Sequence, residues 1–366
     1  MGFKCGIIGL PNIGKSTLFN ALTESNKAEA ANYPFATINP NIGRVAVKDK
    51  RLEELSKINS SLKNIPTYMD FVDIAGLVKG ASKGEGLGNK FLSHIREVDA
   101  IAHVVRCFEN ENISHVTQNI NPIRDIDIID TEIKLADIQT LENKYYTLEK
   151  KNKVGDKLLE IELKLIKNLL EKINNNLSLM SYKWSKNELN IINNLNLITT
   201  KPSFYICNVD ENSITQGNKF SEQVKKKCIE QKSEVIIISA SIESQIAQLM
   251  NQKEKQEFLN EINLKETSIN KFINLGYNLL NLITFFTSGP KETRAWTIKK
   301  YTKAPDAANK IHTDFKKGFI RAEIISFEDY MIHKSESLCK EKGKLRQEGK
   351  EYEIRDGDVI NFLFNV

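Results

Sequence analysis

Residues 9–17, Gly-Leu-Pro-Asn-Ile-Gly-Lys-Ser-Thr, decide the fold of this chain. They match the pattern G-x-x-x-x-G-K-[ST], in which glycines let successive main-chain N–H groups converge on phosphate oxygens at the start of a helix. A short apolar strand is predicted before the loop, at residues 3–8, and apolar side chains recur at helical spacing over residues 17–22. A glycine-rich turn without a ligand would not need this lysine and hydroxyl in this order. The pattern therefore predicts binding of a nucleoside triphosphate.

Each side chain of this loop has a predicted task. Lys15 is expected to reach the β- and γ-phosphates, and the Ser16 hydroxyl to bind Mg²⁺. The rest of the predicted phosphate-binding set consists of Asn12, Ile13, Gly14 and Thr17.

Composition sets the broad class. The 366 residues are enough for two or three domains, and 40% hydrophobic and 27% charged residues are ordinary values for a globular protein. No apolar run reaches the roughly 18 residues that span a bilayer, and a strand at the start leaves no room for a signal peptide. Five distant cysteines without a C-x-x-C pair favour buried free thiols in a reducing compartment. We therefore expect a cytoplasmic protein without a membrane segment.

The strand pattern predicts the fold class. Strand-like runs lie at residues 44–47, 67–73, 100–108, 203–208 and 235–238, and they alternate with helical segments. This order favours a doubly wound, mostly parallel α/β sheet with its ligand at the carboxyl ends of the strands. Between residues 135 and 173, two apolar repeats at helical spacing flank a lysine-rich polar turn, which predicts an inserted antiparallel helical hairpin. The last 85 or so residues alternate strands with a helix predicted over residues 304–315, as in a small α+β unit.

These segments give a predicted domain organisation. Residues 1–130 and 200–278 form the nucleotide-binding domain, residues 131–199 the helical hairpin, and residues 279–366 the C-terminal unit.

Further motifs follow in the order of a GTPase-type site. Thr37 lies about twenty residues after the P-loop lysine, where a switch threonine would bind Mg²⁺. The D-x-x-G pattern at residues 73–76 would supply Asp73 to Mg²⁺ and the Gly76 N–H to the γ-phosphate. Each signal alone is weak, but their order after a complete P-loop makes the set specific.

Longer stretches resemble one family, the YchF family of Obg-like ATPases. They are Tyr33-Pro34-Phe35-Ala36-Thr37, the run from Asp73 to Ala81, Asn208-Val209-Asp210-Glu211, Arg294-Ala295-Trp296-Thr297-Ile298, the run from Ile311 to Phe315 and the run from Lys317 to Ala322. The resemblance runs from end to end of the chain. It implies an OBG-type G domain, a coiled-coil insertion and a TGS domain of β-grasp type. It also implies ATP hydrolysis and association with ribosomes.

The base-reading segment favours ATP over GTP. GTPases of this type read guanine with N-K-x-D, whereas this chain has Val209 in place of the lysine and Glu211 in place of the aspartate. Such changes misplace the carboxylate that accepts both guanine donors. The predicted base-binding residues are Asn208, Val209, Glu211, Ser239 and Ala240. A conventional GTPase remains the alternative, because Asp210 could read guanine after a shift in register.

The group that orients the attacking water is not the usual one. Leu77 follows the D-x-x-G pattern and cannot hydrogen-bond, so another side chain must act. His115 follows a strand at the ligand edge and is the first candidate; its alternative is an ordinary surface histidine. His94 is a second candidate, and His103 is expected in the core. Asn12 resembles the potassium-binding asparagine of cation-activated relatives, unless it only hydrogen-bonds its own loop.

The partners follow from the same reasoning. We expect ATP, Mg²⁺ and a ribosome, with K⁺ as a second candidate cation, the large subunit as the ribosomal partner, RNA as a contact and a monomeric state. Two runs of basic residues near the C-terminus, and the lysines of the hairpin turn, are candidate contacts with phosphate backbone; the alternative is a solvated surface. The C-terminal runs are Lys299, Lys300 and Lys303, and Lys340, Lys342, Lys344 and Arg346. The chain is then either an ATPase whose turnover drives a switch in translation or stress regulation, or a nucleotide-gated ribosome-binding module with negligible turnover.

Overall fold

The computed structural model describes residues 3–24, 42–74, 87–111, 113, 119–151, 156–249 and 251–365. The chain divides into two compact units. Unit 1 comprises residues 1–3, 44–70 and 270–366, and unit 2 comprises residues 4–43 and 71–269.

A parallel sheet forms the centre of unit 2. Four strands of this sheet are β1 (Phe3–Ile8), β5 (Ala100–Cys107), β6 (Ser203–Val209) and β7 (Glu234–Ile238), adjacent in that order. Each neighbouring pair is parallel, so all four carboxyl ends meet at one edge. Every residue of β5 is buried, as expected of a strand that helices cover on both faces. The predicted parallel α/β sheet is confirmed.

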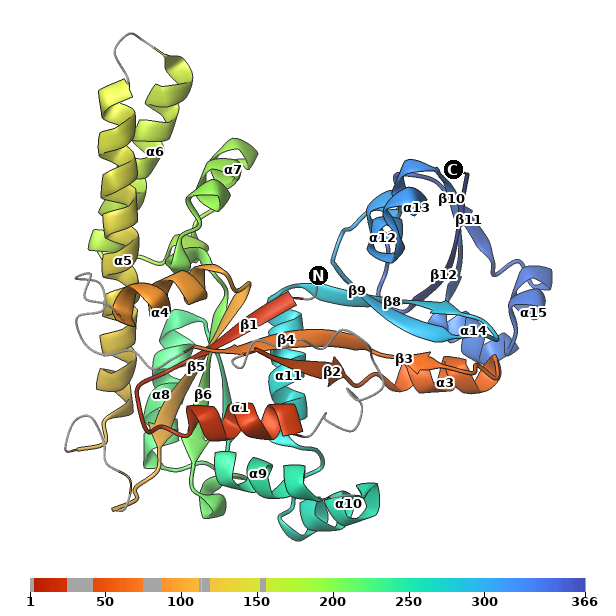
Figure 1. Ribbon diagram of the computed structural model, residues 1–366, viewed down its shortest axis with the longest axis horizontal. Coiled ribbons are helices and arrows are strands. Elements are labelled where there is room, and N and C mark those ends of the chain that lie inside the picture. Colours follow the sequence, from red (N-terminus) through yellow and green to blue (C-terminus); the bar gives the residue numbers. More distant parts are fainter. Residues whose placement is uncertain are drawn as a thin grey trace. The chain divides into compact units, whose positions relative to one another are not determined.

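Helices cover both faces of this sheet (Figure 1). The helices of unit 2 are α1 (Lys15–Glu24), α4 (Leu87–Arg96), α5 (Pro122–Lys151), α6 (Lys157–Asn174), α7 (Lys186–Leu195), α8 (Lys219–Gln231), α9 (Ala240–Gln248) and α10 (Gln252–Glu261), with 3-10 turns η2 (Leu179–Ser181), η3 (Ile198–Thr200) and η4 (Glu211–Ser213). Helix α1 packs against α9, and α5 and α8 pack against β5 and β6.

The predicted helical hairpin is present as α5 and α6, which lie side by side in Figure 1. Its own core includes Leu141, Leu165 and Leu169, which are fully or almost fully buried. Helix α5 begins at Pro122, before the predicted boundary at residue 131, because its first turns also pack against the parallel sheet through Ile126. Residues 152–155 of the lysine-rich turn lie outside the described residues. The domain boundaries therefore stay predictions.

A second sheet, of mixed direction, forms the centre of unit 1. Its strands are β3 (Asn64–Ile65), β8 (Leu282–Ser288), β9 (Thr293–Lys299), β10 (Phe319–Ser326), β11 (Arg346–Glu348) and β12 (Asp358–Phe364), in the order β11-β10-β12-β8-β9-β3. Strands β8 and β9 form an antiparallel hairpin, and the last strand, β12, lies parallel to β8. Helix α12 (Ala304–Ile311) covers this sheet through three fully buried alanines. This is the small α+β unit that the sequence predicts.

The helix predicted over residues 304–315 is in fact two helices. His312 adopts an extended conformation between α12 and α13 (Thr313–Lys317), and its imidazole accepts a hydrogen bond from the Asp314 N–H at 3.2 Å. The side-chain cap therefore starts a new helix where the apolar periodicity alone predicts continuation.

The remaining elements complete the two units. They are β2 (Ile42–Val47), α3 (Lys50–Ile58), β4 (Thr67–Asp73), α11 (Ser268–Leu279), α14 (Phe327–His333) and α15 (Glu336–Glu341). Helix α3 belongs to unit 1, where Leu52 and Leu55 pack with residues of β8, β10 and β12. All five cysteines are buried and free, as predicted. Among the described helices, none is long and apolar enough to cross a membrane.

Candidate nucleotide-binding site

The loop between β1 and α1 has the backbone of a phosphate-binding loop. Gly14 has φ +88°, and a Cβ atom there would lie 2.2 Å from Nδ2 of Asn208, so only glycine fits. Asn12 also has a positive φ, of 60°, and Ile13 anchors the loop in the core with 2% of its surface exposed. Helix α1 begins at Lys15, which puts the first helical N–H groups beside the loop. The loop and the helix N-terminus therefore have the backbone arrangement that the predicted anion site requires.

Three side chains meet at this helix start. The Lys15 ammonium forms an ion pair with Asp73, and the Ser16 hydroxyl donates to Oδ2 of the same carboxylate at 3.3 Å. Asp73 ends β4, and the next residue, Ile74, donates its N–H to the Ile7 carbonyl at 3.2 Å. This bond fixes the carboxylate next to the P-loop. The structure thus brings together three residues that lie up to 58 positions apart and that the sequence assigned to one site.

The donor set at this point suits Mg²⁺. A hydroxyl and a carboxylate are hard oxygen ligands of the kind that Mg²⁺ binds, usually together with waters and substrate phosphates. Within the described residues there is no group of three or more His, Cys, Asp or Glu side chains that could hold a metal by themselves. A site of this kind therefore relies on the phosphates of the nucleotide to complete the ligand set.

Asn208 connects the P-loop to the loop that follows β7. Its Nδ2 donates to the Ile13 carbonyl at 2.8 Å, and its Oδ1 accepts from the Ala240 N–H at 2.9 Å. The side chain is 4% exposed, so both bonds are shielded from water. Asn208 therefore holds two loops of the site together, which is a structural task beside the predicted contact with the base.

The other side chains of the base-reading segment are also held by the protein. Val209 is buried in the core between β5, β6 and α8, so its side chain cannot cover a base as the GTPase lysine does. Asp210 accepts from the Ser213 N–H and hydroxyl at 3.1 and 2.9 Å and thereby starts η4. This commitment opposes the register shift by which Asp210 would read guanine. Only main-chain atoms of Val209 could therefore contact a base.

Glu211 and Ser239 have different surroundings. Oε1 of Glu211 accepts from the Ser241 hydroxyl at 2.6 Å and from Nε2 of Gln245 at 3.3 Å, which turns the carboxylate towards α9. Ser239 is 1% exposed, and among the described residues its hydroxyl has no hydrogen-bond partner. Ser239 precedes Ala240 at the start of α9, as the predicted support of the base requires.

Sequence reasoning missed Arg106, which organises the loop after β5. Its guanidinium is buried and donates to the carbonyls of Phe108, Asn110 and Ile113 at 3.1–3.2 Å. The signal was available, because an arginine inside a fully buried strand must find acceptors. Arg106 fixes the course of the segment that leads towards residue 115.

Several predicted residues lie outside the described residues, namely Thr37, Gly76, Leu77 and His115. His94 is exposed on α4, and among the described residues no hydrogen bond or ion pair joins it to the P-loop. His103 is buried in the middle of β5 at 4% exposure, as predicted.

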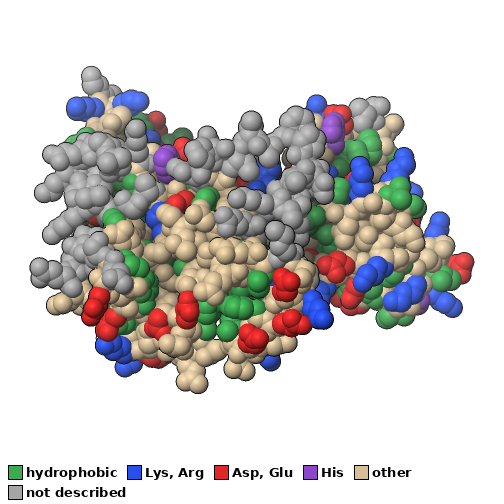
Figure 2. Space-filling view, turned by 60° about the horizontal axis from the view of Figure 1, so that its bottom comes forward, with side chains coloured by type: hydrophobic (Ala, Val, Ile, Leu, Met, Phe, Trp, Pro, Cys, Tyr) green, Lys and Arg blue, Asp and Glu red, His purple; other side chains and the backbone are tan. Residues whose placement is uncertain are grey.

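The basic runs of the C-terminal unit are partly neutralised. Lys303 pairs with Glu351, Lys344 pairs with Asp329 at 3.1 Å, and Arg346 lies 3.6 Å from both Glu348 and Asp358. In Figure 2, Lys and Arg side chains are interspersed with Asp and Glu on the face that is shown. Lys299, Lys300, Lys340 and Lys342 are exposed and remain candidates for contact with a polyanion.

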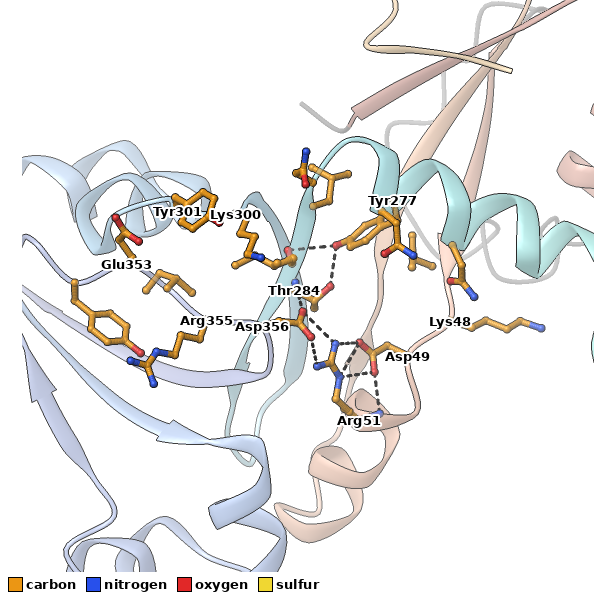
Figure 3. Close-up of a pocket in the computed structure, with 18 of the residues that line it drawn as sticks. Lys48, Asp49, Arg51, Tyr277, Thr284, Lys300, Tyr301, Glu353, Arg355 and Asp356 are labelled. Carbon is orange, nitrogen blue, oxygen red and sulfur yellow. Dashed lines mark hydrogen bonds and ion pairs between the residues drawn. The ribbon is translucent and has the colours of Figure 1, made fainter. Parts of the chain in front are cut away.

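A separate cavity of about 890 Å³ lies within unit 1 (Figure 3). In its lining, the Arg51 guanidinium bridges Asp49 at 2.8 Å and Asp356 at 2.7 Å. The Asp356 carboxylate also accepts a hydrogen bond from the Thr284 N–H at 2.8 Å. Tyr277 bonds to the hydroxyls of Thr284 and Thr297, and burial raises its pKa to about 12. These groups hydrogen-bond or pair with one another, and none of the residues predicted to bind nucleotide or Mg²⁺ lines the cavity.

The parallel sheet, the loop at the start of α1 and the grouping of Lys15, Ser16 and Asp73 define a P-loop nucleotide-binding protein of GTPase type. Curated relatives resemble the chain over its whole length: the ribosome-binding ATPase YchF of Escherichia coli O157:H7 is 52% identical over 366 residues, and that of Bacillus subtilis (strain 168) is 47% identical over 368 residues, each with 100% of both chains covered. The chain belongs to the YchF family.

Domain profiles and a solved structure agree. A family described as 50S ribosome-binding GTPase matches residues 4–150, and the YchF GTPase C-terminal family, described as a protein of unknown function, matches residues 282–365. The structure of the YchF GTPase of Schizosaccharomyces pombe superposes with a TM-score of 0.90 at 39% identity, covering 99% of this chain and 98% of that one.

Proposed function

We propose that this protein is a ribosome-associated ATPase that hydrolyses ATP to ADP and phosphate and acts as a nucleotide-dependent switch in translation or stress regulation. Its bacterial relatives are named ribosome-binding ATPases, whereas the relative from Schizosaccharomyces pombe is named a GTPase. The choice of nucleotide therefore needs an argument from the residues of this chain.

The base-reading segment carries that argument. Guanine presents two N–H donors to one carboxylate, and in N-K-x-D proteins a lysine stem covers the base. Here Val209 is packed into the core, and Asp210 is committed to Ser213. The Glu211 carboxylate, one methylene longer than aspartate, is turned to Ser241. A site whose polar groups cannot pair with guanine loses its preference for guanine, and this favours ATP.

The phosphates and the metal would be bound by the residues around α1. Lys15 and the main chain of Asn12, Ile13, Gly14, Thr17 and Gly76 would hold the phosphate oxygens, and Ser16, Asp73 and Thr37 would hold Mg²⁺. When bound, Mg²⁺ neutralises charge that develops on the phosphates. The present ion pair lets Lys15 and Asp73 stabilise each other until the lysine turns to the γ-phosphate. Asn12 is the candidate ligand for K⁺, which would add positive charge where an arginine finger acts in other NTPases.

Water activation is assigned to the segment after β5. Arg106 fixes this segment through three carbonyls, and we assign the orientation of the attacking water to His115 further along it. Without a glutamine after the D-x-x-G pattern, turnover is expected to be slow, as in other switches of this class.

The finer parts of the proposal concern partners. We propose the large ribosomal subunit as the partner, with RNA contacts through the lysines of the hairpin turn and through the exposed lysines of the C-terminal unit, which we take to be a TGS domain. The description of the family that matches residues 4–150 supports the large subunit. We further propose a cytoplasmic monomer.

Two measurements test the function. Equilibrium titration of the purified protein with ATP and GTP should show tighter binding of ATP; tighter binding of GTP would make it a conventional GTPase. Steady-state ATP turnover, measured with and without 50S subunits, should rise with the ribosome. Binding of ribosomes in the ATP state with no turnover in either condition would instead indicate a nucleotide-gated binding module.

A further inference from the structure

Tyr301 is a strained and exposed aromatic residue of unit 1. It lies in the turn between β9 and α12, has φ +68° and is 68% exposed. A bulky side chain disfavours a positive φ, and in the described part of the chain most of the other non-glycine residues with positive φ are asparagines. An exposed tyrosine by itself needs no explanation, but one in a conformation that asparagine adopts more readily does. Its presence at this position therefore points to a task for the ring.

The protein itself makes little use of this ring. Among the described residues no other aromatic ring stacks on Tyr301, and the contact that involves its face is with the Lys300 ammonium, 5.4 Å from the ring centroid. The backbone of the turn is fixed on both sides, because the Thr302 N–H donates to the Lys299 carbonyl at 3.2 Å and the Lys300 N–H donates to the Asn281 carbonyl at 2.8 Å. The turn thus presents a flat ring, with an ammonium group beside it, from a fixed backbone.

Tyr301 also lines the cavity of about 890 Å³ in unit 1. In Figure 3, Tyr301 and Lys300 lie side by side at one end of this cavity, and Lys48 lies at the other. Within the described part of the chain, Lys48, Lys300 and Arg355 form no ion pair, although all three line the cavity. Basic groups that are available to a ligand therefore stand at both ends of the cavity.

Four carboxylates share the lining, and most of them are already paired. The pairs are Arg51 with Asp49 and Asp356, and Lys303 with Glu351. The fourth carboxylate belongs to Glu353, whose backbone forms a β-bridge with Lys303. The basic groups without an ion pair thus outnumber the one carboxylate in the same state, and this favours an anionic ligand.

We propose that Tyr301 stacks on an unpaired base of single-stranded RNA, whose phosphates lie against Lys300 and the other basic groups of the cavity. The proposal rests on the RNA contact of the C-terminal unit proposed above and names the residue that reads the strand. A flat ring beside ammonium groups is the combination by which proteins hold single strands, because every base has a π-face and every nucleotide a phosphate. Basic groups at both ends of the cavity suit successive phosphates of one strand, whereas a mononucleotide carries its phosphate at one end.

The test uses the full-length protein with saturating ADP and Mg²⁺, which occupy the nucleotide site. Two RNA strands of about twelve nucleotides are compared by fluorescence anisotropy, one of oligouridylate and one of the same length whose sugars carry no bases. Oligouridylate should bind with a dissociation constant on the order of 10 µM at about 50 mM salt. The strand without bases should bind roughly tenfold more weakly, because it has nothing to stack on the ring.

Tyr301→Asn is the decisive variant, because asparagine fits a positive φ better than tyrosine does. It should bind the two strands with equal affinity, while the midpoint of urea denaturation stays the same or rises. Tyr301→Phe should keep the native preference for oligouridylate, since the flat ring remains. Ile229→Asn, at a 76% exposed position on α8, is the matched control and should also behave as the native protein does.

Lys300→Ala tests the phosphate contact. It should weaken the binding of both strands and reduce the slope of log affinity against log salt by about 0.7, the value expected for one phosphate of a single strand. Lys253→Ala, at an 87% exposed position, should leave the slope unchanged.

The stacking site is overturned if the native protein does not distinguish the two strands, or if Tyr301→Asn keeps the native preference. It is also overturned if uridine monophosphate displaces the strand at an equal concentration of nucleotide units, since the ligand would then be a mononucleotide. Cosedimentation of the native protein with ribosomes is measured separately. Its absence would refute the proposed function, whereas cosedimentation without discrimination between the two strands would refute the stacking site alone.

Discussion

The two halves of the nucleotide site are built differently. The phosphate half consists of main-chain groups around Gly14 and of side chains that point to one place, with Lys15 and Ser16 both on Asp73. In the base half, Asn208, Asp210 and Glu211 hold neighbouring loops and helices instead. Phosphate recognition thus depends on a backbone path that few sequences can adopt. Base recognition depends on side chains that can instead form hydrogen bonds within the protein. The phosphate half is therefore recognisable as a sequence motif, and the base half is the part in which substitutions can change the nucleotide preference.

The largest effect is expected in the phosphate half. Lys15→Ala removes the only ammonium that the motif directs to the phosphates and leaves Asp73 without its ion-pair partner. Single-turnover hydrolysis of ATP should fall on the order of a thousandfold, or about 4 kcal/mol, because the lysine stabilises charge that develops in the transition state. Lys253→Ala, at an 87% exposed position, is the control and should leave the rate unchanged. If ATP hydrolysis in Lys15→Ala stays within tenfold of the native rate, the phosphate half is not built as described.

The next effect tests whether the base half is chiefly structural. Asn208→Ala deletes the bonds to Ile13 and Ala240 and leaves a buried carbonyl and a buried N–H without partners. The free energy of unfolding should fall by about 2–3 kcal/mol, measured by urea denaturation. Affinities for ATP and GTP should fall together, since the P-loop itself loses support. Loss of ATP affinity alone, with unchanged stability, would show that Asn208 reads adenine and does not hold the loops.

The same division explains what could be predicted from sequence. The P-loop, the parallel strands and the helical hairpin follow from local patterns, because glycine positions and apolar periodicity determine them within a few residues. The role of Arg106 does not, because its acceptors come from an irregular segment without periodicity. The membership of α3 in unit 1 rests on contacts distant in sequence, such as the hydrogen bond from the Arg51 guanidinium to the Asp356 carboxylate at 2.7 Å. The end of α12 rests on the conformation of one residue, His312.

A smaller effect is expected at Arg106, which holds the segment after β5 and belongs to neither the phosphate half nor the base half of the site. Arg106→Met keeps the buried aliphatic part and removes the donors to three carbonyls. The value of kcat should fall about tenfold, or ~1.4 kcal/mol, with KM changed less than twofold, because the nucleotide contacts are elsewhere. The double variant with His115→Ala should be no slower than the slower single variant if both act through one water. Additive losses would assign Arg106 to a separate task.

The smallest effect is expected at Glu211, the residue that replaces the guanine-reading aspartate. Its carboxylate accepts from Ser241 and Gln245 at the exposed start of α9. Glu211→Gln keeps an oxygen acceptor there and removes only the charge, which water screens at an exposed position. The ratio of ATP to GTP affinity should change less than about threefold, or ~0.6 kcal/mol, in competition titrations. Glu211→Ala is the matched comparison, since it removes both acceptor and charge and should loosen α9 without reversing the preference. A change of more than about tenfold in the ratio for Glu211→Gln would mean that this carboxylate reads the base after all, and the contrast between the two halves of the site would then be lost.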